Sequence, residues 1–258
     1  MEELIRMDEN TILLEELKSE FQDTVIQEVL PGILHNFANP LNGIMGRSRL
    51  LQKRAAEVLG SDGKGADNQP SDAARGKILR DVDLIVEQGD RFYELFGQVS
   101  GKMQRIHDMR RGPVNLSELA AAELGFLDFY LDFKHSIEKH VNLTMDVPTV
   151  DGVVADYSLA LSAILRYTMN SMLDCPVRIL SVFSDYDSTF VSIVISDTGV
   201  HDESLAGDLK AASAGQAPSI HRGIIGAVKL LKKYGARVTL DTNANINKIT
   251  ISVPYGER

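Results

Sequence analysis

The sequence contains no tryptophan and a single cysteine, Cys175, in 258 residues. One cysteine cannot form a disulfide within the chain or supply a thiolate cage for a metal, so neither is expected to stabilise the fold. No apolar run approaches the roughly eighteen residues that a membrane helix needs. The first residues, MEELIRMDENTILLEEL, are acidic, whereas a secretory signal is basic and then apolar. We therefore expect a cytoplasmic protein without a membrane span.

Basic residues are also in the minority. The chain carries 27 Lys and Arg against 36 Asp and Glu, a formal net charge of -9. Contact with nucleic acid depends on clustered Lys and Arg that displace counterions from phosphates, so we expect no nucleic-acid partner. What the sequence does have is a globular composition, 44% apolar and 24% charged, in a chain long enough for one large or two ordinary domains.

Two long stretches of the first half carry apolar or small residues in alternating steps of four and three, which is typical of a packed helix. The first runs from Phe21 to Val58 and the second from Ile78 to Ile106. Residues 60–72 between them, GSDGKGADNQPSD, show no apolar period and are typical of a connecting loop. The pattern therefore predicts an antiparallel helical hairpin.

A hairpin of this kind leaves much of each apolar stripe uncovered. Pairing of two hairpins into an antiparallel four-helix bundle covers both stripes in the simplest way, so we expect a homodimer. The acidic segment before the first helix is expected to be a solvated extension of the bundle.

The sequence period changes after Pro113. Asn115 predicts a capped helix start, and Gly235 predicts the end of the last helix. Segments rich in β-branched residues lie among the helical patterns and predict strands that begin near residues 141, 177, 189, 236 and 248. Together they predict an α+β fold, with residues 1–112 as the hairpin domain. Residues 113–258 are expected to form a two-layer α/β sandwich, a mixed sheet with helices on one face.

His35 lies in the segment ILHNFANPLNGIMG, residues 33–46, on the side of the first helix away from its apolar stripe. Its helical neighbours are small residues or short amides, which leaves a low polar surface that another protein can approach closely. They are Pro31, Gly32, Ala38, Asn39 and Asn42. Pro40 is expected to bend the helix, because it removes a backbone hydrogen bond and clashes one turn back. The plainer alternative is a solvated histidine beside a tolerated kink.

The segment HNFANPL, from His35 to Leu41, resembles the H-box of two-component sensor histidine kinases. In that motif the phosphoacceptor histidine stands five residues before proline-leucine on the first helix of a dimeric hairpin. The resemblance implies that His35 carries a phosphoryl group and that receiver domains of response regulators are its partners. Asn36 takes the place next to the phosphoacceptor. Asn39 matches the place where related kinases keep a threonine or asparagine that orients water for dephosphorylating a regulator.

The second half resembles the Bergerat-like ATPase domain of the same kinases. DYSLALSAILRYTMNSML is similar to the N-box helix and places Asn170 where an asparagine holds the magnesium ion on the triphosphate. VISDTGV is similar to the next box, in which Asp197 would meet the adenine amino group and Gly199 would allow a close turn. RGIIGAVKLLKKYG is similar to the last glycine box and places Gly223 in it.

The resemblance of the second half therefore implies ATP and Mg as cofactors. Two plainer interpretations of the same residues stay open. Asn170 can be a polar residue at a helix edge, and Asp197 to Gly199 can be an ordinary turn after a strand.

Five departures from the family's pattern fall in the parts that bind and activate ATP. Asn36 replaces the carboxylate that polarises the imidazole, and an amide cannot act as that base. Arg166 replaces the first asparagine of the N-box, His201 replaces a glycine, and Ile224 takes the place of a glycine whose amide would cradle phosphate. The lid, DESLAGDLKAASAGQAPSIH, lacks the aromatic residue and the glycine run of the family's lids. These departures predict a degenerate ATP site beside an intact phosphoacceptor surface.

The hypothesis that the sequence favours is a histidine phosphotransfer protein of a phosphorelay. It would pass phosphate through His35 to or from response-regulator aspartates, with the receiver domain supplying the Mg. One alternative is an active ATP-dependent sensor histidine kinase with divergent boxes. The other is a non-catalytic pseudokinase scaffold that moves no phosphate.

Overall fold

The computed structural model describes residues 9–60, 72–201, 205, 207, 222–243 and 246–256. The chain divides into two compact units, one made of Met1–Val29 with Gly101–Arg258 and the other of Leu30–Ser100. They are called the sheet unit and the hairpin unit below. The functional boundary expected after residue 112 stays a prediction. The loop expected over residues 60–72 and the lid expected over residues 202–221 lie almost wholly outside the described residues.

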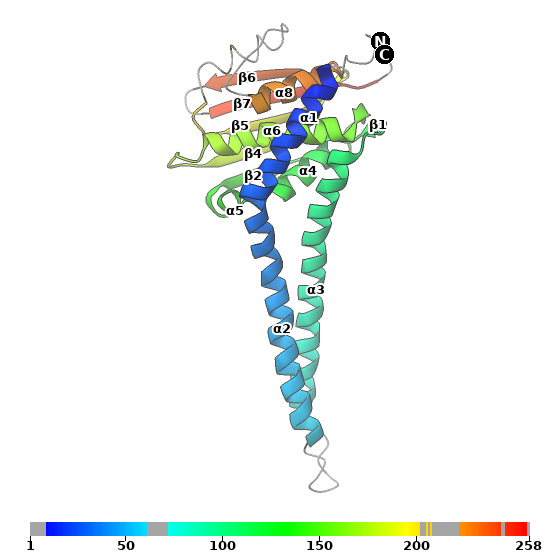
Figure 1. Cartoon of the computed structure of the whole chain (residues 1–258), viewed down its shortest axis with the longest axis vertical. Helices are drawn as coiled ribbons and strands as arrows, with labels where there is room; N and C mark the ends of the chain where they lie inside the picture. The colour runs from blue at the N-terminus through cyan, green and yellow to red at the C-terminus, as the bar shows by residue number, and fades with distance from the viewer. Residues whose placement is uncertain are drawn as a thin grey trace, which may run out of the picture. The chain divides into compact units, whose positions relative to one another are not determined.

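Two long helices form the hairpin unit, α2 (Leu30–Gly60) and most of α3 (Asp72–His107) (Figure 1). The side chains that meet between them show an antiparallel pairing. The rings of Phe37 and Phe92 stand edge to face with centroids 5.2 Å apart. Farther along α2, Arg54 forms an ion pair with Asp81, whose side chain is 1% exposed. Residue numbers therefore rise along one helix as they fall along the other, and the predicted hairpin is confirmed.

The main sheet of the sheet unit has five strands in the order β2-β4-β5-β7-β6 (Figure 1). The β2 and β4 strands are parallel, and all other neighbours are antiparallel, which confirms the expected mixed sheet. The strands are β2 (Glu138–Asn142), β4 (Ile179–Tyr186), β5 (Phe190–Asp197), β6 (Arg237–Asn243) and β7 (Ile246–Pro254). A separate two-stranded sheet pairs β1 (Arg111–Val114) with β3 (Val150–Val153).

The strand expected from residue 141 begins earlier, because β2 occupies residues 138–142. Beyond β2, the Thr144 backbone N–H donates to the Ser184 hydroxyl at 2.8 Å. Beyond Asn142, this bond to a serine side chain of β4 takes the place of a backbone-to-backbone bond between the strands. The apolar pattern of the sequence continues to residue 147, so it did not show that the strand ends at residue 142.

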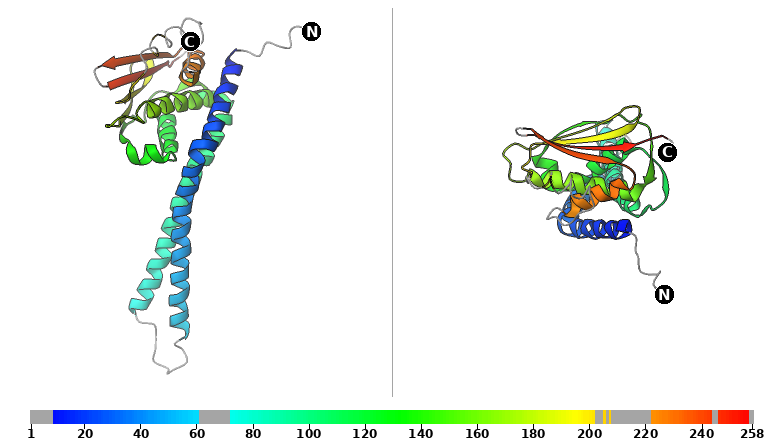
Figure 2. Two further views of the ribbon diagram at one scale, coloured as in Figure 1. Left: turned by 60° about the vertical axis from the view of Figure 1, so that its left-hand side comes forward. Right: turned by 90° about the horizontal axis from the view of Figure 1, so that it is seen from above.

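Helices cover one face of the main sheet (Figure 2). They are α4 (Leu116–Leu127), α5 (Leu131–Ser136), α6 (Val154–Ser171) and α8 (Arg222–Lys232). The Asn115 side chain accepts hydrogen bonds from the N–H groups of Ser117 and Glu118, which confirms the predicted start of α4. The α+β class predicted from the sequence is confirmed. In the described part of the chain, no helix is both long and apolar enough to cross a membrane.

A helix that precedes the hairpin, α1 (Glu9–Thr24), leads through a π-helical turn, η1 (Val25–Val29), into α2. Its side chains Leu14, Leu17 and Phe21 are buried, and α1 packs against α6 and α8. In the right-hand view of Figure 2, α6 and α8 lie between α1 and the sheet. The expectation of a solvated N-terminal extension was wrong, because steps of three and four make one face of this acidic helix apolar.

Candidate functional site

His35 is exposed on α2 in a surface whose other members are small. Ala38, Asn39 and Asn42 are exposed with it, whereas Gly32 on the preceding turn is buried. The open surface predicted from the sequence is therefore present on the hairpin unit, except on the side of Gly32.

Asn36, the residue after His35, is buried, with 3% of its surface exposed. A neutral amide has no basic site that could take the imidazole proton. The helix continues through Pro40 within α2, and the bend expected there stays a prediction. His35 is thus an accessible imidazole whose neighbour in the chain offers no general base.

The hairpin unit exposes large apolar side chains along both of its helices. The following are more than half exposed: Leu34, Met45, Leu79, Val86, Tyr93 and Phe96. Two members of the predicted stripes, Leu41 and Val82, are 42% and 39% exposed. Apolar surface on this scale is typical of a face that associates with another protein.

A second group of predicted residues gathers at the end of β5. Asp197 is the last residue of that strand and is 1% exposed, and Gly199 follows it closely. A Cβ on Gly199 would lie 2.0 Å from the Ser171 Oγ and 2.7 Å from the Ser171 carbonyl carbon, so only glycine fits. Asn170 precedes Ser171 at the end of α6 and is exposed. The structure therefore brings Asn170, Asp197 and Gly199 to one corner.

The carboxylate of Asp197 is bound by donors of the protein itself. Its Oδ1 accepts hydrogen bonds from the Gly199 N–H at 2.7 Å, the Asn247 side chain at 3.1 Å and the Ser171 hydroxyl at 3.3 Å. The His201 Nε2 lies 3.0 Å from Oδ2, and it must be the donor because a carboxylate only accepts. Sequence reasoning missed Asn247, which faces Asp197 in the pairing of β5 with β7.

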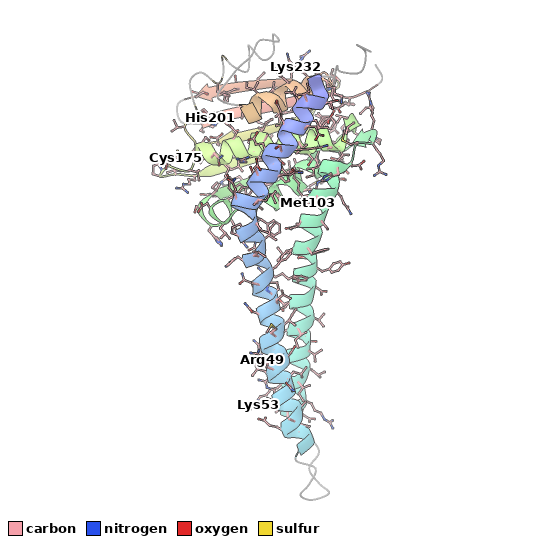
Figure 3. The ribbon with its side chains drawn as sticks, in the orientation of Figure 1. Arg49, Lys53, Met103, Cys175, His201 and Lys232 are labelled. Carbon is pink, nitrogen blue, oxygen red and sulfur yellow. The ribbon has the colours of Figure 1, made fainter. Side chains whose placement is uncertain are left out.

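His201, labelled in Figure 3, has its ring against the Asp197 carboxylate. Its side chain is 3% exposed and stands edge to face against Tyr167, with ring centroids 5.1 Å apart. Its Nδ1 is buried and has no hydrogen-bond partner among the described residues. This ring thus occupies one side of the Asp197 carboxylate as the corner is arranged.

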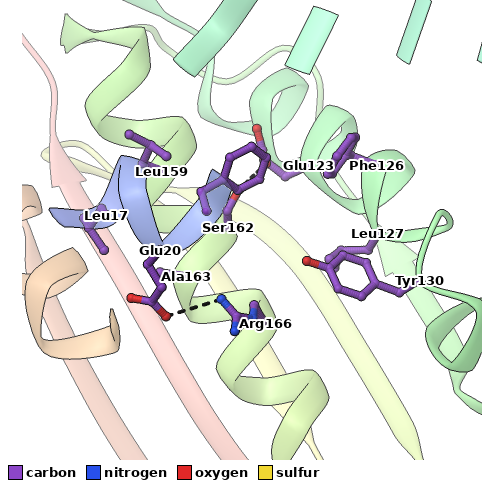
Figure 4. Close-up of a pocket in the computed structure, with 11 residues that line it drawn as sticks. Leu17, Glu20, Glu123, Phe126, Leu127, Tyr130, Leu159, Ser162, Ala163 and Arg166 are labelled. Carbon is purple, nitrogen blue, oxygen red and sulfur yellow. Dashed lines mark hydrogen bonds and ion pairs between the residues drawn. The ribbon is translucent and has the colours of Figure 1, made fainter. Parts of the chain in front are cut away.

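Gly223, in the first turn of α8, lies against α1. A Cβ at this position would come within 2.9 Å of both carboxylate oxygens of Glu20. That carboxylate is 3.3 Å from the guanidinium of Arg166, which is also 3.6 Å from Glu28 (Figure 4). Ile224 is 2% exposed and belongs to the core. A carboxylate of the chain itself thus lies beside the first turn of α8.

The magnesium ion assigned to Asn170 would arrive with a nucleotide, so it stays a prediction together with the ATP. Within the described ranges, no cluster of three or more His, Cys, Asp or Glu is placed to hold a metal ion.

A buried charge network joins the end of α3 to α4 and α6, and sequence reasoning missed it. The Lys102 Nζ, fully buried, is 2.6 Å from the Glu123 carboxylate and 2.9 Å from the Ser158 hydroxyl. The Ser162 hydroxyl donates to the same carboxylate at 2.6 Å. Burial lowers the pKa of Lys102, and the charge of Glu123 opposes that shift. Removal of either charge would leave the other buried without its partner, which is costly.

A small cavity lies beside this network, between α1, α4 and α6 (Figure 4). Its volume is about 30 Å³, which is room for roughly two water molecules. Apolar side chains such as Leu17, Phe126 and Leu127 form much of its wall. The cavity is thus a packing gap between helices rather than a site for a ligand.

No known protein family and no curated protein matches the chain. Among solved structures, it is similar to the histidine kinase AdeS of Acinetobacter baumannii, with 13% identity, a TM-score of 0.44, and coverage of 81% of this chain and 94% of that one. The catalytic domain of the histidine kinase ThkA gives 17% identity and a TM-score of 0.48, covering 57% of this chain and 97% of that one.

The histidine kinase domain of a blue-light activated kinase from Erythrobacter litoralis gives 15% identity and a TM-score of 0.45. The similarity covers 80% of this chain and 95% of that one. All three are histidine kinases, and identities this low assign no activity to the chain. The function proposed below depends on the residues of the chain itself.

Proposed function

We propose that this chain is a histidine phosphotransfer protein of a two-component phosphorelay. His35 accepts a phosphoryl group from an aspartyl phosphate of a response-regulator receiver domain and returns it to another. The observation that supports this most directly is the exposure of His35 among small residues on α2. A large partner domain needs such a surface to bring its phosphoaspartate within bonding distance of the imidazole.

The transfer step asks little of this chain beyond an accessible imidazole. The lone pair of one His35 nitrogen attacks phosphorus, the bond from phosphorus to the aspartate oxygen breaks, and the carboxylate leaves. The imidazole proton is released to solvent, and a phosphohistidine remains. An acyl phosphate is a reactive donor, so the absence of a carboxylate at Asn36 is tolerated. The receiver supplies the Mg and the positive charge that stabilise the phosphoryl group.

The ATP and Mg site is proposed to be degenerate. Asp197, which the resemblance gives to adenine, already has four partners within the protein. Glu20 lies against Gly223 at the start of α8. These contacts count against the alternative of an active ATP-dependent kinase. They are compatible both with a phosphotransfer protein and with a pseudokinase scaffold. Transfer of phosphate to His35 distinguishes these two functions.

The exposed apolar side chains of the hairpin support a homodimer. In one chain Phe96 and Val82 of the predicted stripes have 51% and 39% of their surface in solvent. Pairing with a second hairpin would bury them in a four-helix bundle. The dimer would present two His35 surfaces to receiver domains.

Asn39 is exposed one turn after His35. Its amide can donate to or accept from a water molecule. We propose that it orients a water for attack on the aspartyl phosphate of a docked receiver. The chain would then also contribute to dephosphorylation of its partner.

A transfer assay with a panel of receiver domains, each phosphorylated with labelled acetyl phosphate, tests the proposed function. In the absence of ATP, at least one receiver should label the chain within seconds to minutes. The label should be stable to base, labile to acid and lost in His35→Ala. His140→Ala, which removes another exposed histidine, should behave like the unmodified chain. If no receiver transfers label to His35, the scaffold becomes the better account.

A further inference from the structure

The first helix of the chain covers part of the layer formed by α6 and α8. Leu14, Leu17 and Phe21 are buried on its inner side. Two glycines of α8 face α1. A Cβ on Gly226 would lie 3.5 Å from Leu17, and a Cβ on Gly223 would lie 2.9 Å from the Glu20 oxygens. A side chain at Gly226 would make an ordinary contact with Leu17, whereas one at Gly223 would require the Glu20 carboxylate to move.

The charge of Glu20 matches the place where it lies. The first turn of a helix carries backbone N–H groups without partners in the helix, and it is the positive end of the helix dipole. Such a helix start favours an anion, and phosphate groups of ligands bind at similar positions. Here the Glu20 carboxylate is against the first turn of α8, and the Arg166 guanidinium of α6 is 3.3 Å away. The carboxylate of the chain itself thus lies beside a helix start that favours an anion.

Glu28 adds a second contact of the same kind. It lies 3.6 Å from Arg166, so one guanidinium is paired with two carboxylates from α1 and η1. Arg166 is 24% exposed and Glu20 46% exposed at the side chain, so solvent reaches this pair. Partly exposed ion pairs are weak, with a typical contribution of about 1 kcal/mol or less. The polar part of the contact is therefore easily exchanged for another anion.

We propose that α1 is an intramolecular cover of the α6 and α8 layer, with Glu20 as a built-in substitute for a phosphate group. The proposal deepens the proposed function, since it takes this layer as a surface of the nucleotide-binding type. The layer is closed by the chain itself as well as altered by substitutions such as Ile224. Because α1 runs through η1 into α2, removal of the cover would also free the segment that precedes the His35 helix.

The test compares Glu20→Ala with Glu16→Ala in the full chain. Glu16 is exposed on the same helix, so both variants change the net charge equally. The probe is inorganic tripolyphosphate, whose binding is measured by calorimetry, and the state of α1 is followed by hydrogen exchange of its backbone amides. Glu20→Ala should bind tripolyphosphate at least about tenfold more tightly than Glu16→Ala and the unmodified chain do. The backbone amides of α1 should also exchange about tenfold faster in Glu20→Ala than in those two proteins.

Gly223→Ala displaces the same carboxylate without changing the net charge, because its methyl group would lie 2.9 Å from the Glu20 oxygens. This variant should also speed hydrogen exchange of the α1 backbone amides. The proposal is overturned if Glu20→Ala binds tripolyphosphate no better than Glu16→Ala, or if neither Glu20→Ala nor Gly223→Ala loosens α1. Transfer of phosphate from a receiver to His35, measured on the same samples, reports separately on the proposed function.

Discussion

The polar side chains of His35 and Asp197 differ in their exposure to solvent and in their bonding within the protein. His35 is exposed on a helix whose neighbouring side chains are small. Asp197 is 1% exposed, and its carboxylate is bound by the Gly199 N–H and by three side chains. A group that must react with a visiting protein has to be accessible, whereas a buried carboxylate must have partners within the fold.

This difference separates two kinds of change in the chain. Replacing Asn36 with a carboxylate would change one side chain, but at a position that is 3% exposed, where the new charge would need a partner. Reopening the Asp197 corner would require removal of the His201 ring, which packs between Asp197 and Tyr167. The four predictions below test this contrast, from the largest expected effect to the smallest.

Glu123→Ala should destabilise the protein most, because it leaves the fully buried Lys102 without its counter-charge. Breaking such a pair typically costs about 3–5 kcal/mol of unfolding free energy. The exposed Glu94→Ala on the hairpin unit should change stability by less than about 0.5 kcal/mol. Chemical denaturation of both variants measures the effect. Equal, small losses would show that the buried network does not hold the sheet unit together.

Phe96→Asp should dissociate the proposed dimer, since it would bury an unpaired charge in the proposed bundle. We expect the dimer dissociation constant to rise at least about 100-fold, which corresponds to roughly 2.7 kcal/mol. Gln98→Asp introduces the same charge at an exposed polar position of α3 and should leave the dimer intact. Sedimentation over a range of concentrations distinguishes them. A dimer that persists in Phe96→Asp would place the interface elsewhere.

Gly199→Ala should destabilise the Asp197 corner but not the His35 surface. The added methyl group would overlap Ser171, and overpacking of this kind typically costs about 1–3 kcal/mol. In the matched variant Gly97→Ala, the new methyl group meets nothing within 4 Å, and this helix position should become more stable by up to about 1 kcal/mol. Thermal unfolding measures both. Loss of stability in Gly97→Ala as well would mean that the contact with Ser171 is not the cause.

Asn39→Ala should have the smallest effect and should act on one reaction only. Loss of the amide that orients water should slow dephosphorylation of a bound receiver about tenfold, or roughly 1.4 kcal/mol in the barrier. Transfer to His35 should change by less than about twofold. Asn42→Ala, exposed on the next turn, is the control for a general effect of amide removal. Parallel decay of both reactions in Asn39→Ala would instead indicate a role in docking.

Local patterns in the sequence predicted the parts of the fold that depend on nearby residues. The steps of four and three indicated the two hairpin helices, and the Asn115 cap indicated the start of α4. The family resemblance placed Gly199 at a close turn, and a side chain there would overlap Ser171. The exposure of His35 followed from its position on the helix wheel.

Contacts between distant residues were not visible in the sequence. Glu20 meets Arg166 across 146 positions, and Asn247 reaches Asp197 across 50. Lys102 lies among the apolar residues of a helical stripe, and nothing near it in the sequence identifies Glu123 as its partner. Such pairings depend on sheet register and helix docking, which local periodicity does not determine.

The source of the phosphoryl group on His35 tests the account most directly. The full chain would be incubated side by side with a labelled phospho-receiver and with labelled ATP and Mg, and the phosphohistidine would be mapped by mass spectrometry. The account predicts label on His35 from the receiver and none from ATP. Label on His35 from ATP, with none from any receiver, would contradict it.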